Sequence, residues 1–177
     1  MSILVYVENW DGKFRKSTLE AVSYAKQTAS IYKTDVKAIS FGEINESELS
    51  ILGEYGVEKI ISYPEILKND GKSVALSIEK ESDGVEMVIF SNTFNAKMIA
   101  PRISSKLNAG IITNVISYIE DSSSVCVKKQ SFSSKAIETV RLKSKIGILA
   151  ISPNAFEIKN DSVDFEVEIK NQELVSD

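Results

Sequence analysis

The stretch MVIFSNTFNAKMIAPRISSKLNAGIITNV, residues 87–115, carries the pattern that decides the fold. It opens with four apolar residues, which is typical of a short strand buried inside a sheet. The polar residues Ser91, Asn92 and Thr93 follow at once, and a helical pattern over 96–108 comes next. A buried strand that passes directly into a helix is the repeating unit of a parallel α/β sheet.

The same unit recurs along the N-terminal two thirds of the chain. Apolar runs alternate there with amphipathic patterns, so we expect one parallel sheet with helices on both faces. The predicted strands cover residues 3–7, 36–41, 57–62 and 86–91, and the predicted helices cover residues 17–33, 46–53, 72–82 and 96–108.

Three local signals concern the ends and the regularity of these helices. Ser17 and Glu20 match a capping box, in which each side chain covers a free amide, so a helix is predicted to start there. Gly53 is placed to end the helix over 46–53. Pro101 lies well inside the last helical pattern, where it predicts a kink or a late helix start.

After Gly110 the pattern changes to short strands without helices between them. Strands are expected over 111–119, 124–130, 136–142 and 145–151, as an antiparallel or mixed extension of the sheet. Residues 163–170 alternate apolar and charged side chains, which predicts one more, half-exposed strand. The predicted fold class is therefore α/β, a three-layer sandwich with a mainly parallel sheet, extended by antiparallel strands in the C-terminal third.

The amino-acid composition argues against several functional classes of protein. The chain has 177 residues and a net charge of −4, so it lacks the basic balance expected of a nucleic-acid-binding protein. It contains no histidine and only Cys126, which excludes an internal disulfide and disfavours a zinc site. We see neither an apolar run of membrane-spanning length nor a signal peptide, and therefore expect a cytoplasmic protein without membrane insertion.

The polar turn after the fourth strand is the candidate ligand site. A helix N-terminus exposes free amides and a partial positive charge, which together suit a phosphate group. Ser91, Asn92 and Thr93 would supply the polar side chains of such a site. The alternative is that Asn92 and Thr93 only cap the helix, and the residues alone leave both interpretations open.

Signatures of catalysis are missing from the sequence. No G-x-G-x-x-G follows the first strand, no P-loop is present, and no histidine could activate a serine or Cys126. We therefore expect no catalytic residues and no metal site, and no enzymatic activity of the chain by itself.

Four segments in series resemble a known family. They are residues 5–8 with 12–13 and 16–21, residues 55–60, residues 93–110, and residues 136–140 with 152–156. In the third segment the matching residues are Thr93, Lys97, Ala100, Pro101, Arg102, Lys106, Leu107 and Gly110. Together they resemble the N-terminal domain of the large (alpha) subunit of electron transfer flavoprotein. The chain departs from the family at Ala96, where glycine is usual, and at 133–135, where the family often has Ala-Gly-Asn.

The resemblance implies a fold and a division of the chain. The fold is of the adenine nucleotide alpha hydrolase-like, or Rossmann-like, type. Residues 1–158 would form the N-terminal domain. Residues 159–177 would form a terminal strand and the start of a linker to a FAD-binding domain, which is absent from this sequence.

The resemblance also implies a function, that of an electron carrier. Such a carrier takes electrons through FAD from acyl-CoA dehydrogenases or similar flavoenzymes, as in fatty acid beta-oxidation, and passes them to a second acceptor. This domain would be its scaffold and docking part, paired with the beta subunit in a heterodimer. FAD is expected in the complete heterodimer and not on this chain alone.

The polar turn at Asn92, Thr93 and Lys97 would then be a vestigial nucleotide site, because the related beta subunit holds AMP at the equivalent place. The alternative is a free-standing nucleotide-binding module of the universal stress protein type. The glycine-rich ATP loop of those proteins is missing between Phe90 and Ala100.

Overall fold

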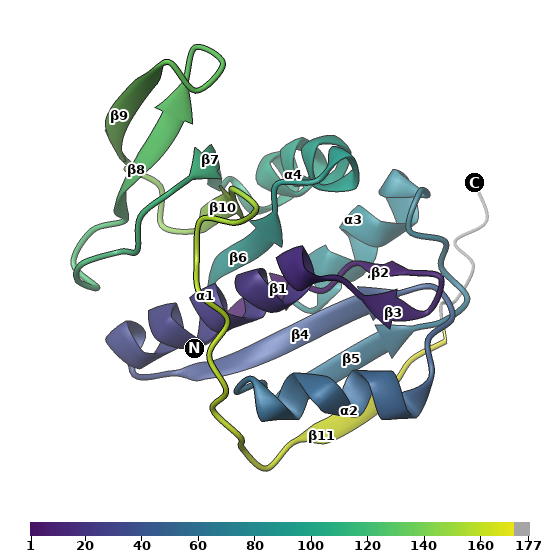
Figure 1. The fold of residues 1–177 in the computed structure, drawn as a ribbon. Helices are drawn as coiled ribbons and strands as arrows, with labels where there is room; N and C mark the ends of the chain where they lie inside the picture. Colours follow the sequence, from purple (N-terminus) through teal and green to yellow (C-terminus); the bar gives the residue numbers. More distant parts are fainter. Residues whose placement is uncertain (172–177) are drawn as a thin grey trace.

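The computed structural model describes residues 1–171, and within them a nine-stranded sheet lies between two layers of helices (Figure 1). The strands of this sheet are β1 (Ser2–Tyr6), β4 (Asp35–Phe41), β5 (Lys59–Tyr63), β6 (Val85–Ser91), β7 (Gly110–Val115), β8 (Cys126–Ser131), β9 (Ala136–Arg141), β10 (Gly147–Ile151) and β11 (Glu166–Ile169). Their order across the sheet is β11-β5-β4-β1-β6-β10-β7-β8-β9. The α/β prediction is thereby confirmed.

The central strands form because their apolar residues can be buried on both faces. In β1 the side chains of Ile3 and Val5 pack in the cluster on one face, and those of Leu4 and Tyr6 pack in the cluster on the other. Each of the four is at most 2% exposed. Strands β5, β4, β1 and β6 pair side by side and in parallel, which confirms the predicted sheet over the first four apolar runs.

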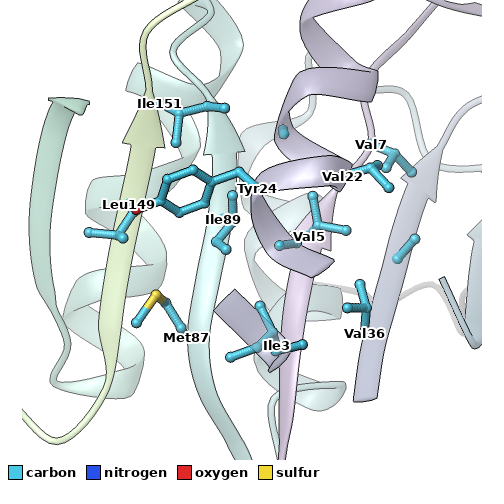
Figure 2. Packing of buried hydrophobic residues seen from close by; sticks show 14 of the residues in the cluster. Ile3, Val5, Val7, Val22, Tyr24, Val36, Met87, Ile89, Leu149 and Ile151 are labelled. Atoms are coloured by element: carbon cyan, nitrogen blue, oxygen red, sulfur yellow. The ribbon is translucent and has the colours of Figure 1, made fainter. Parts of the chain in front are cut away.

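Four helices cover the two faces within the described part of the chain. They are α1 (Lys16–Tyr32) and α2 (Glu46–Glu54) on one face, and α3 (Gly71–Lys80) and α4 (Phe94–Leu107) on the other. In Figure 2 the ring of Tyr24, from α1, lies against Ile89, Leu149 and Ile151 of the sheet. The three-layer prediction is therefore confirmed.

The predicted capping box at the start of α1 is wrong. The helix begins at Lys16, and its N-cap residue Arg15 makes no side-chain cap. Glu20 instead accepts a hydrogen bond from the backbone N–H of Asn154 at 2.7 Å. The Glu20 side chain, which the capping box would have used, is therefore bonded to a residue far along the chain.

The predicted end of α2 at Gly53 is also wrong, because the helix continues to Glu54. Gly53 serves a packing purpose instead. A Cβ atom built on it would lie 2.2 Å from the ring of Phe165, which crosses the helix at this point.

Helix α4 starts earlier than predicted. It begins at Phe94 and continues through Pro101 to Leu107, so the proposed late start is wrong. The cap supplied by Thr93 sets the start, because its hydroxyl accepts a hydrogen bond from the N–H of Ala96 at 3.1 Å. Since Pro101 has no N–H, the helix forgoes one internal hydrogen bond.

The C-terminal third contains both parallel and antiparallel strands. Strand β10 inserts between β6 and β7 and is parallel to both. Strands β8 and β9 are antiparallel to each other, and β8 joins the sheet by antiparallel pairing with β7, where Val115 lies opposite Lys129. In Figure 1 this hairpin projects away from the body of the protein. We refer to residues 126–145, the hairpin and the four residues after it, as the arm.

After β10 the chain returns to the far edge of the sheet. Residues 152–165, here called the strap, pass over α1 and α2 before β11 begins (Figure 1). The backbone N–H of Lys159 donates to the hydroxyl of Ser23 at 3.1 Å, and that of Val163 donates to the carbonyl of Gly53 at 3.1 Å. The strand predicted over 163–170 is confirmed as β11, which pairs in parallel with β5.

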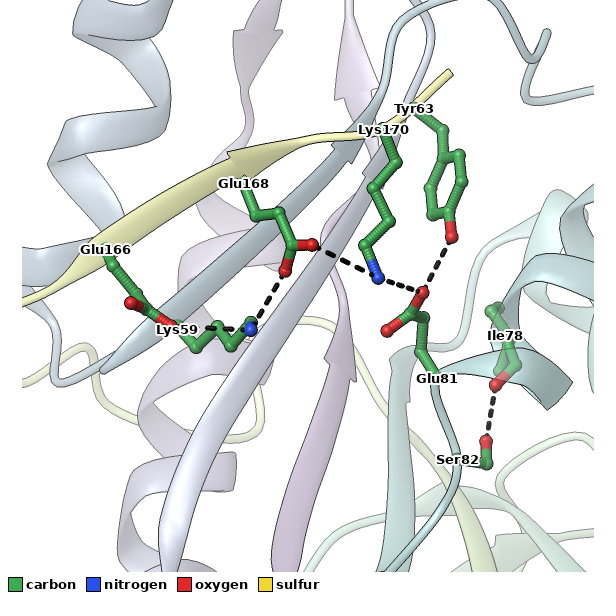
Figure 3. A network of polar contacts seen from close by, with 8 residues as sticks. All are labelled: Lys59, Tyr63, Ile78, Glu81, Ser82, Glu166, Glu168 and Lys170. Atoms are coloured by element: carbon green, nitrogen blue, oxygen red, sulfur yellow. Dashed lines mark hydrogen bonds and ion pairs between the residues drawn. The ribbon is translucent and has the colours of Figure 1, made fainter. Parts of the chain in front are cut away.

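Ion pairs fasten β11 to its neighbours, as Figure 3 shows. Lys59 lies 2.9 Å from a carboxylate oxygen of Glu168. Lys170 lies 2.7 Å from Glu81, which also accepts a hydrogen bond from the hydroxyl of Tyr63 at 2.7 Å. This edge of the sheet therefore carries charges of both signs in mutual contact.

Candidate functional site

The centre of the sheet has the topology at which α/β proteins usually bind ligands. Strand β1 has β4 on one side and β6 on the other, so the connections leave it in opposite directions. Ligands of open parallel sheets bind beyond the carboxyl ends of the strands at such a point. The polar turn after β6 lies there, next to Glu8, two residues beyond the end of β1.

Thr93 and Glu8 form the core of this site. The Thr93 hydroxyl caps α4 and donates its own proton to Oε2 of Glu8, at 2.7 Å. The other carboxylate oxygen of Glu8 accepts a hydrogen bond from the side-chain amide of Asn95 at 2.5 Å. A residue from the end of β1 is thereby joined to the first turn of α4.

The Glu8 carboxylate is buried, with the residue only 3% exposed. Its backbone carbonyl accepts a hydrogen bond from the Thr18 hydroxyl at 2.8 Å, which fixes the chain beyond β1 against α1. Burial raises the pKa of the neighbouring Tyr6, and the charge of Glu8 raises it further. Negative charge from the protein itself thus lies at the N-terminus of α4, where a phosphate of a ligand would otherwise be favoured.

The three predicted site residues do not form one constellation. Asn92 donates from its side-chain amide to Oδ1 of Asn114 in β7, and Thr93 contacts Glu8 as described. Lys97 is exposed, and its side chain makes no hydrogen bond or ion pair with residues 1–171. The structure therefore places Asn92 and Thr93 at the switch point and leaves Lys97 out of it.

Sequence reasoning missed Glu8, Asn95 and Asn114 as members of this site. The one available signal was Glu8, an acidic residue directly after a continuous apolar run, where a charge is costly to bury without partners. Its partners Thr93 and Asn95 lie more than eighty residues further along the chain. Their contact depends on β1 pairing with β6 and is not encoded in any local motif.

A cleft lies beside the switch point, at the carboxyl ends of β1, β4 and β5. Its volume is about 560 Å³, and its lining includes Asn9, Gly42, Leu67 and Lys68. The short hairpin of β2 (Asn9–Trp10) and β3 (Lys13–Phe14) forms one side. Its turn, Asp11 and Gly12, has positive φ at both residues, as tight hairpin turns require.

The cations next to this cleft already have partners. The Arg15 guanidinium and the Lys68 ammonium each lie over the Trp10 ring, 4.0 Å from its centroid. Lys68 also donates to the backbone carbonyl of Asn9 at 2.7 Å. We therefore attribute to Trp10 a packing role, in which it holds the hairpin against the end of the sheet.

Among residues 1–171, no group of three His, Cys, Asp or Glu side chains is placed to hold a metal ion. No helix in that part of the chain is long and apolar enough to cross a bilayer. Cys126 is a free, half-buried thiol in β8.

Comparison with known proteins gives one consistent family. A family model described as an electron transfer flavoprotein domain matches residues 3–175. The electron transfer flavoprotein subunit alpha of Syntrophomonas wolfei subsp. wolfei is 26% identical over 160 residues, covering 88% of this chain and 49% of that protein. The subunit alpha of Bacillus subtilis is 26% identical over 156 residues, with 86% and 47% covered. The chain thus spans about half the length of these relatives.

Proposed function

Because this chain belongs to the electron transfer flavoprotein domain family, we propose that it is the N-terminal scaffold and docking domain of an alpha-type subunit. The observation that carries the proposal is the match over residues 3–175, together with two alpha subunits that align with most of the chain. The domain would position a flavin-bearing assembly without catalysing a reaction itself. Electron transfer would be a property of the complete complex.

The cofactor of the complete complex is proposed to be FAD, held by other parts of it. Bound FAD would supply one- and two-electron redox chemistry. The residues at the switch point do not suit its pyrophosphate, because the buried Glu8 carboxylate would repel it and no glycine-rich loop offers backbone amides. The adjoining cleft adds no unpaired cation, since Lys68 is already bonded to Asn9.

The proposed partners follow from the same family. The chain would pair with a beta-type subunit, receive electrons in the cytoplasm from acyl-CoA dehydrogenases or similar flavoenzymes, and pass them to a second acceptor. We propose that residues 1–158 form the domain proper and that 159–177 lead toward a FAD-binding domain. Residues 172–177 of that segment lie outside the described part of the chain.

The universal stress protein alternative gains no support from the site. A nucleotide-binding module needs its helix N-terminus open to phosphate, and here Thr93 and Asn95 direct their donors to Glu8 instead. We expect no micromolar binding of ATP or AMP to the chain, measured by isothermal titration calorimetry. Tight binding that is lost on Thr93→Ala would favour the alternative.

Mixing the chain with its small subunit tests the main proposal. The purified chain should show no flavin absorbance, and it should elute with the small subunit of the same organism as one complex in size-exclusion chromatography. The two subunits are expected in a 1:1 ratio, and the complex should persist on the column because obligate interfaces are large. A yellow chain with stoichiometric flavin, or the absence of any complex, would overturn the proposal.

A further inference from the structure

We propose that a cleft at the amino ends of the central strands binds a small zwitterion with an apolar body, such as a free apolar amino acid or an apolar dipeptide. This amino-end cleft has a volume of about 700 Å³, compared with about 560 Å³ for the cleft at the carboxyl ends. The inference goes beyond the proposed function, because the cleft lies at the opposite end of the sheet and its ligand requires neither flavin nor a second subunit.

Segments that are far apart in sequence build the amino-end cleft. They include Tyr32 at the end of α1, the turn from α3 into β6 at 82–86, the loop 122–125 before β8, and the segment 142–146 between β9 and β10. Open parallel sheets usually bind ligands beyond the carboxyl ends of their strands. The general rule for this fold therefore does not account for a cleft at the amino ends.

A β-bulge places an acidic residue in the amino-end cleft. The register of β6 against β1 shifts between Ser2 and Ile3, so Glu86 has no partner on β1. Bulges of this kind redirect side chains and are common next to binding sites. Glu86 lines the cleft, and so does Asp83 from the turn before it. The β6 side of the cleft is therefore acidic.

The segment after β9 supplies positive charge to the same cleft. Lys143 and Lys145 are both exposed, and both line it. Within residues 1–171, neither lysine forms an ion pair with Glu86 or Asp83, although all four side chains belong to one cleft. The opposite charges thus stay apart, and each is available to a ligand that carries both signs.

Two glycines let the segment after β9 pack closely against the sheet. A Cβ atom on Gly110 would lie 2.7 Å from Oγ of Ser144, and one on Gly147 would lie 3.1 Å from a methyl carbon of Leu142. The Ser144 hydroxyl also accepts a hydrogen bond from the N–H of Gly110 at 2.9 Å. The segment that carries the two lysines is therefore held in place before any ligand arrives, which lowers the entropic cost of binding.

Tyr32 adds a hydrogen-bond donor near the acidic side. Its side chain is half-buried and lines the cleft. Burial raises the pKa of its hydroxyl, and the negative charges of Glu86 and Asp121 raise it further. The hydroxyl therefore keeps its proton at neutral pH, and within residues 1–171 it makes no hydrogen bond.

The lining of the cleft selects the class of ligand. Its two acidic and two basic side chains balance, so a ligand with only one charge would leave the opposite pair unmatched. A zwitterion can direct its ammonium to Glu86 and its carboxylate to the lysines, as charge-assisted hydrogen bonds favour. Apolar side chains of Val125, Leu142 and Ile146 also line the cleft and would cover an apolar body. Ligand clefts of about 300–1,000 Å³ are usual for small molecules.

A dipeptide and two blocked forms of it test the inference on the full chain. Phenylalanyl-leucine is titrated into the isotope-labelled protein and followed by NMR. We expect saturable shifts at the amides of Glu86, Ser124 and Lys145. The N-acetylated dipeptide lacks the ammonium and the dipeptide amide lacks the carboxylate, so each should bind at least about tenfold more weakly.

Variants of the charged residues should match the blocked peptides. Glu86→Gln should weaken the dipeptide about tenfold but leave the N-acetylated form unchanged, because that form has no ammonium to place. Lys143→Gln with Lys145→Gln should likewise weaken the dipeptide and spare the dipeptide amide. Tyr32→Phe keeps the ring and should reduce affinity about threefold through the lost hydroxyl.

Matched variants at the other end of the sheet control for net charge. Glu65→Gln, and the pair Lys13→Gln with Lys97→Gln, remove exposed charges of the same signs away from the cleft and should keep affinity within about twofold. Thermal melts would establish that all variants fold.

Four results would overturn the inference. They are no amide shifts with the dipeptide or with L-phenylalanine up to the millimolar range, shifts confined to residues outside the cleft, equal affinity for the dipeptide and both blocked forms, and equal losses in the cleft variants and their controls. None of these results depends on flavin or on a partner subunit, so they leave the proposed function untouched.

Discussion

The two edge strands of the sheet, β11 and β9, differ in how their charged side chains are paired. Within the described residues, each is paired on one side only, and each contains glutamate. At β11 the charges meet one another, with Lys59 on Glu168 and Lys170 on Glu81. At β9 the cations of the arm have no ion-pair partner within residues 1–171.

The two edges therefore differ in how their charged side chains are paired within the described residues. Edge strands are commonly protected by charge, which disfavours pairing with other chains. The β11 edge follows that rule, with compensated charges and the strap holding the strand in place. On the β9 side, the arm has six cationic side chains and one acidic side chain.

The largest expected effect tests how firmly the strap is held at the β11 edge. Gly53→Val places a side chain where the Phe165 ring lies, and should reduce the free energy of unfolding by about 2 kcal/mol through overpacking. Urea denaturation measures it. The double variant with Phe165→Ala should recover part of the loss, and an unchanged loss would show that the ring is not the cause.

Removing the ion pairs at the β11 edge should have a smaller effect on the free energy of unfolding. Glu81→Ala removes the partner of both Lys170 and Tyr63 and should cost about 1 kcal/mol in the free energy of unfolding. Glu79→Ala is the control, because Glu79 pairs only with Lys106 on the surface and should cost less. Equal costs in the two variants would contradict the special role of the β11 edge.

Acidification should weaken the β11 edge. The hydrogen bond from Lys59 lowers the pKa of Glu168, so its contribution to stability is present above the unfolded pKa of about 4.3 and is lost as pH falls through the folded value. Glu168→Gln should therefore destabilise the chain at neutral pH by less than about 1 kcal/mol, and not at all at low pH. Denaturation at both pH values checks this, with Glu138→Gln on the arm as an inert control.

The smallest expected effect lies at the β9 edge. Replacing Lys128, Arg141 and Lys143 by alanine should change the free energy of unfolding by less than about 0.5 kcal/mol, because these exposed side chains have no ion-pair partner in the described chain. A clear loss in a denaturant melt would show that the arm's charges stabilise the fold, and the comparison of the two edges would fail.

Much of the body could be predicted from sequence because its signals are continuous and local. The run Ile3 to Val7 is apolar throughout, and only a strand buried on both faces accommodates such a run in so few residues. Strand β11 was equally visible in the alternation over 163–170, although its place at the far edge was not. That place depends on the path of the strap.

The predictions that failed concern residues whose partners are distant in sequence. Ser17 and Glu20 match a capping box in sequence, but the Glu20 carboxylate accepts a hydrogen bond from Asn154 in the strap, which crosses α1. Glycine is common at helix ends, but Gly53 lies inside α2, where the lack of a side chain leaves room for the Phe165 ring. Pairing rules that use only neighbouring residues cannot anticipate either contact.

The candidate site shows the same division. Thr93 was correctly expected at the start of a helix, because its capping role depends only on Ala96 three residues later. The carboxylate that occupies the site comes from Glu8, and only the pairing of β1 with β6 brings it there. Lys97 was included because it matches the strand-to-helix motif of the family, but its side chain is exposed.

The strap also has a consequence for the order in which the molecule assembles. Val167 in β11 pairs with Ile60 in β5, the most distant partners in sequence of any strand pair in the described sheet. Contacts with such long separation form late, since the intervening chain must first be ordered. During synthesis β5 must therefore wait as an open edge until residues near 170 leave the ribosome. The nascent chain would be most prone to wrong pairing, and most in need of a chaperone, at β5.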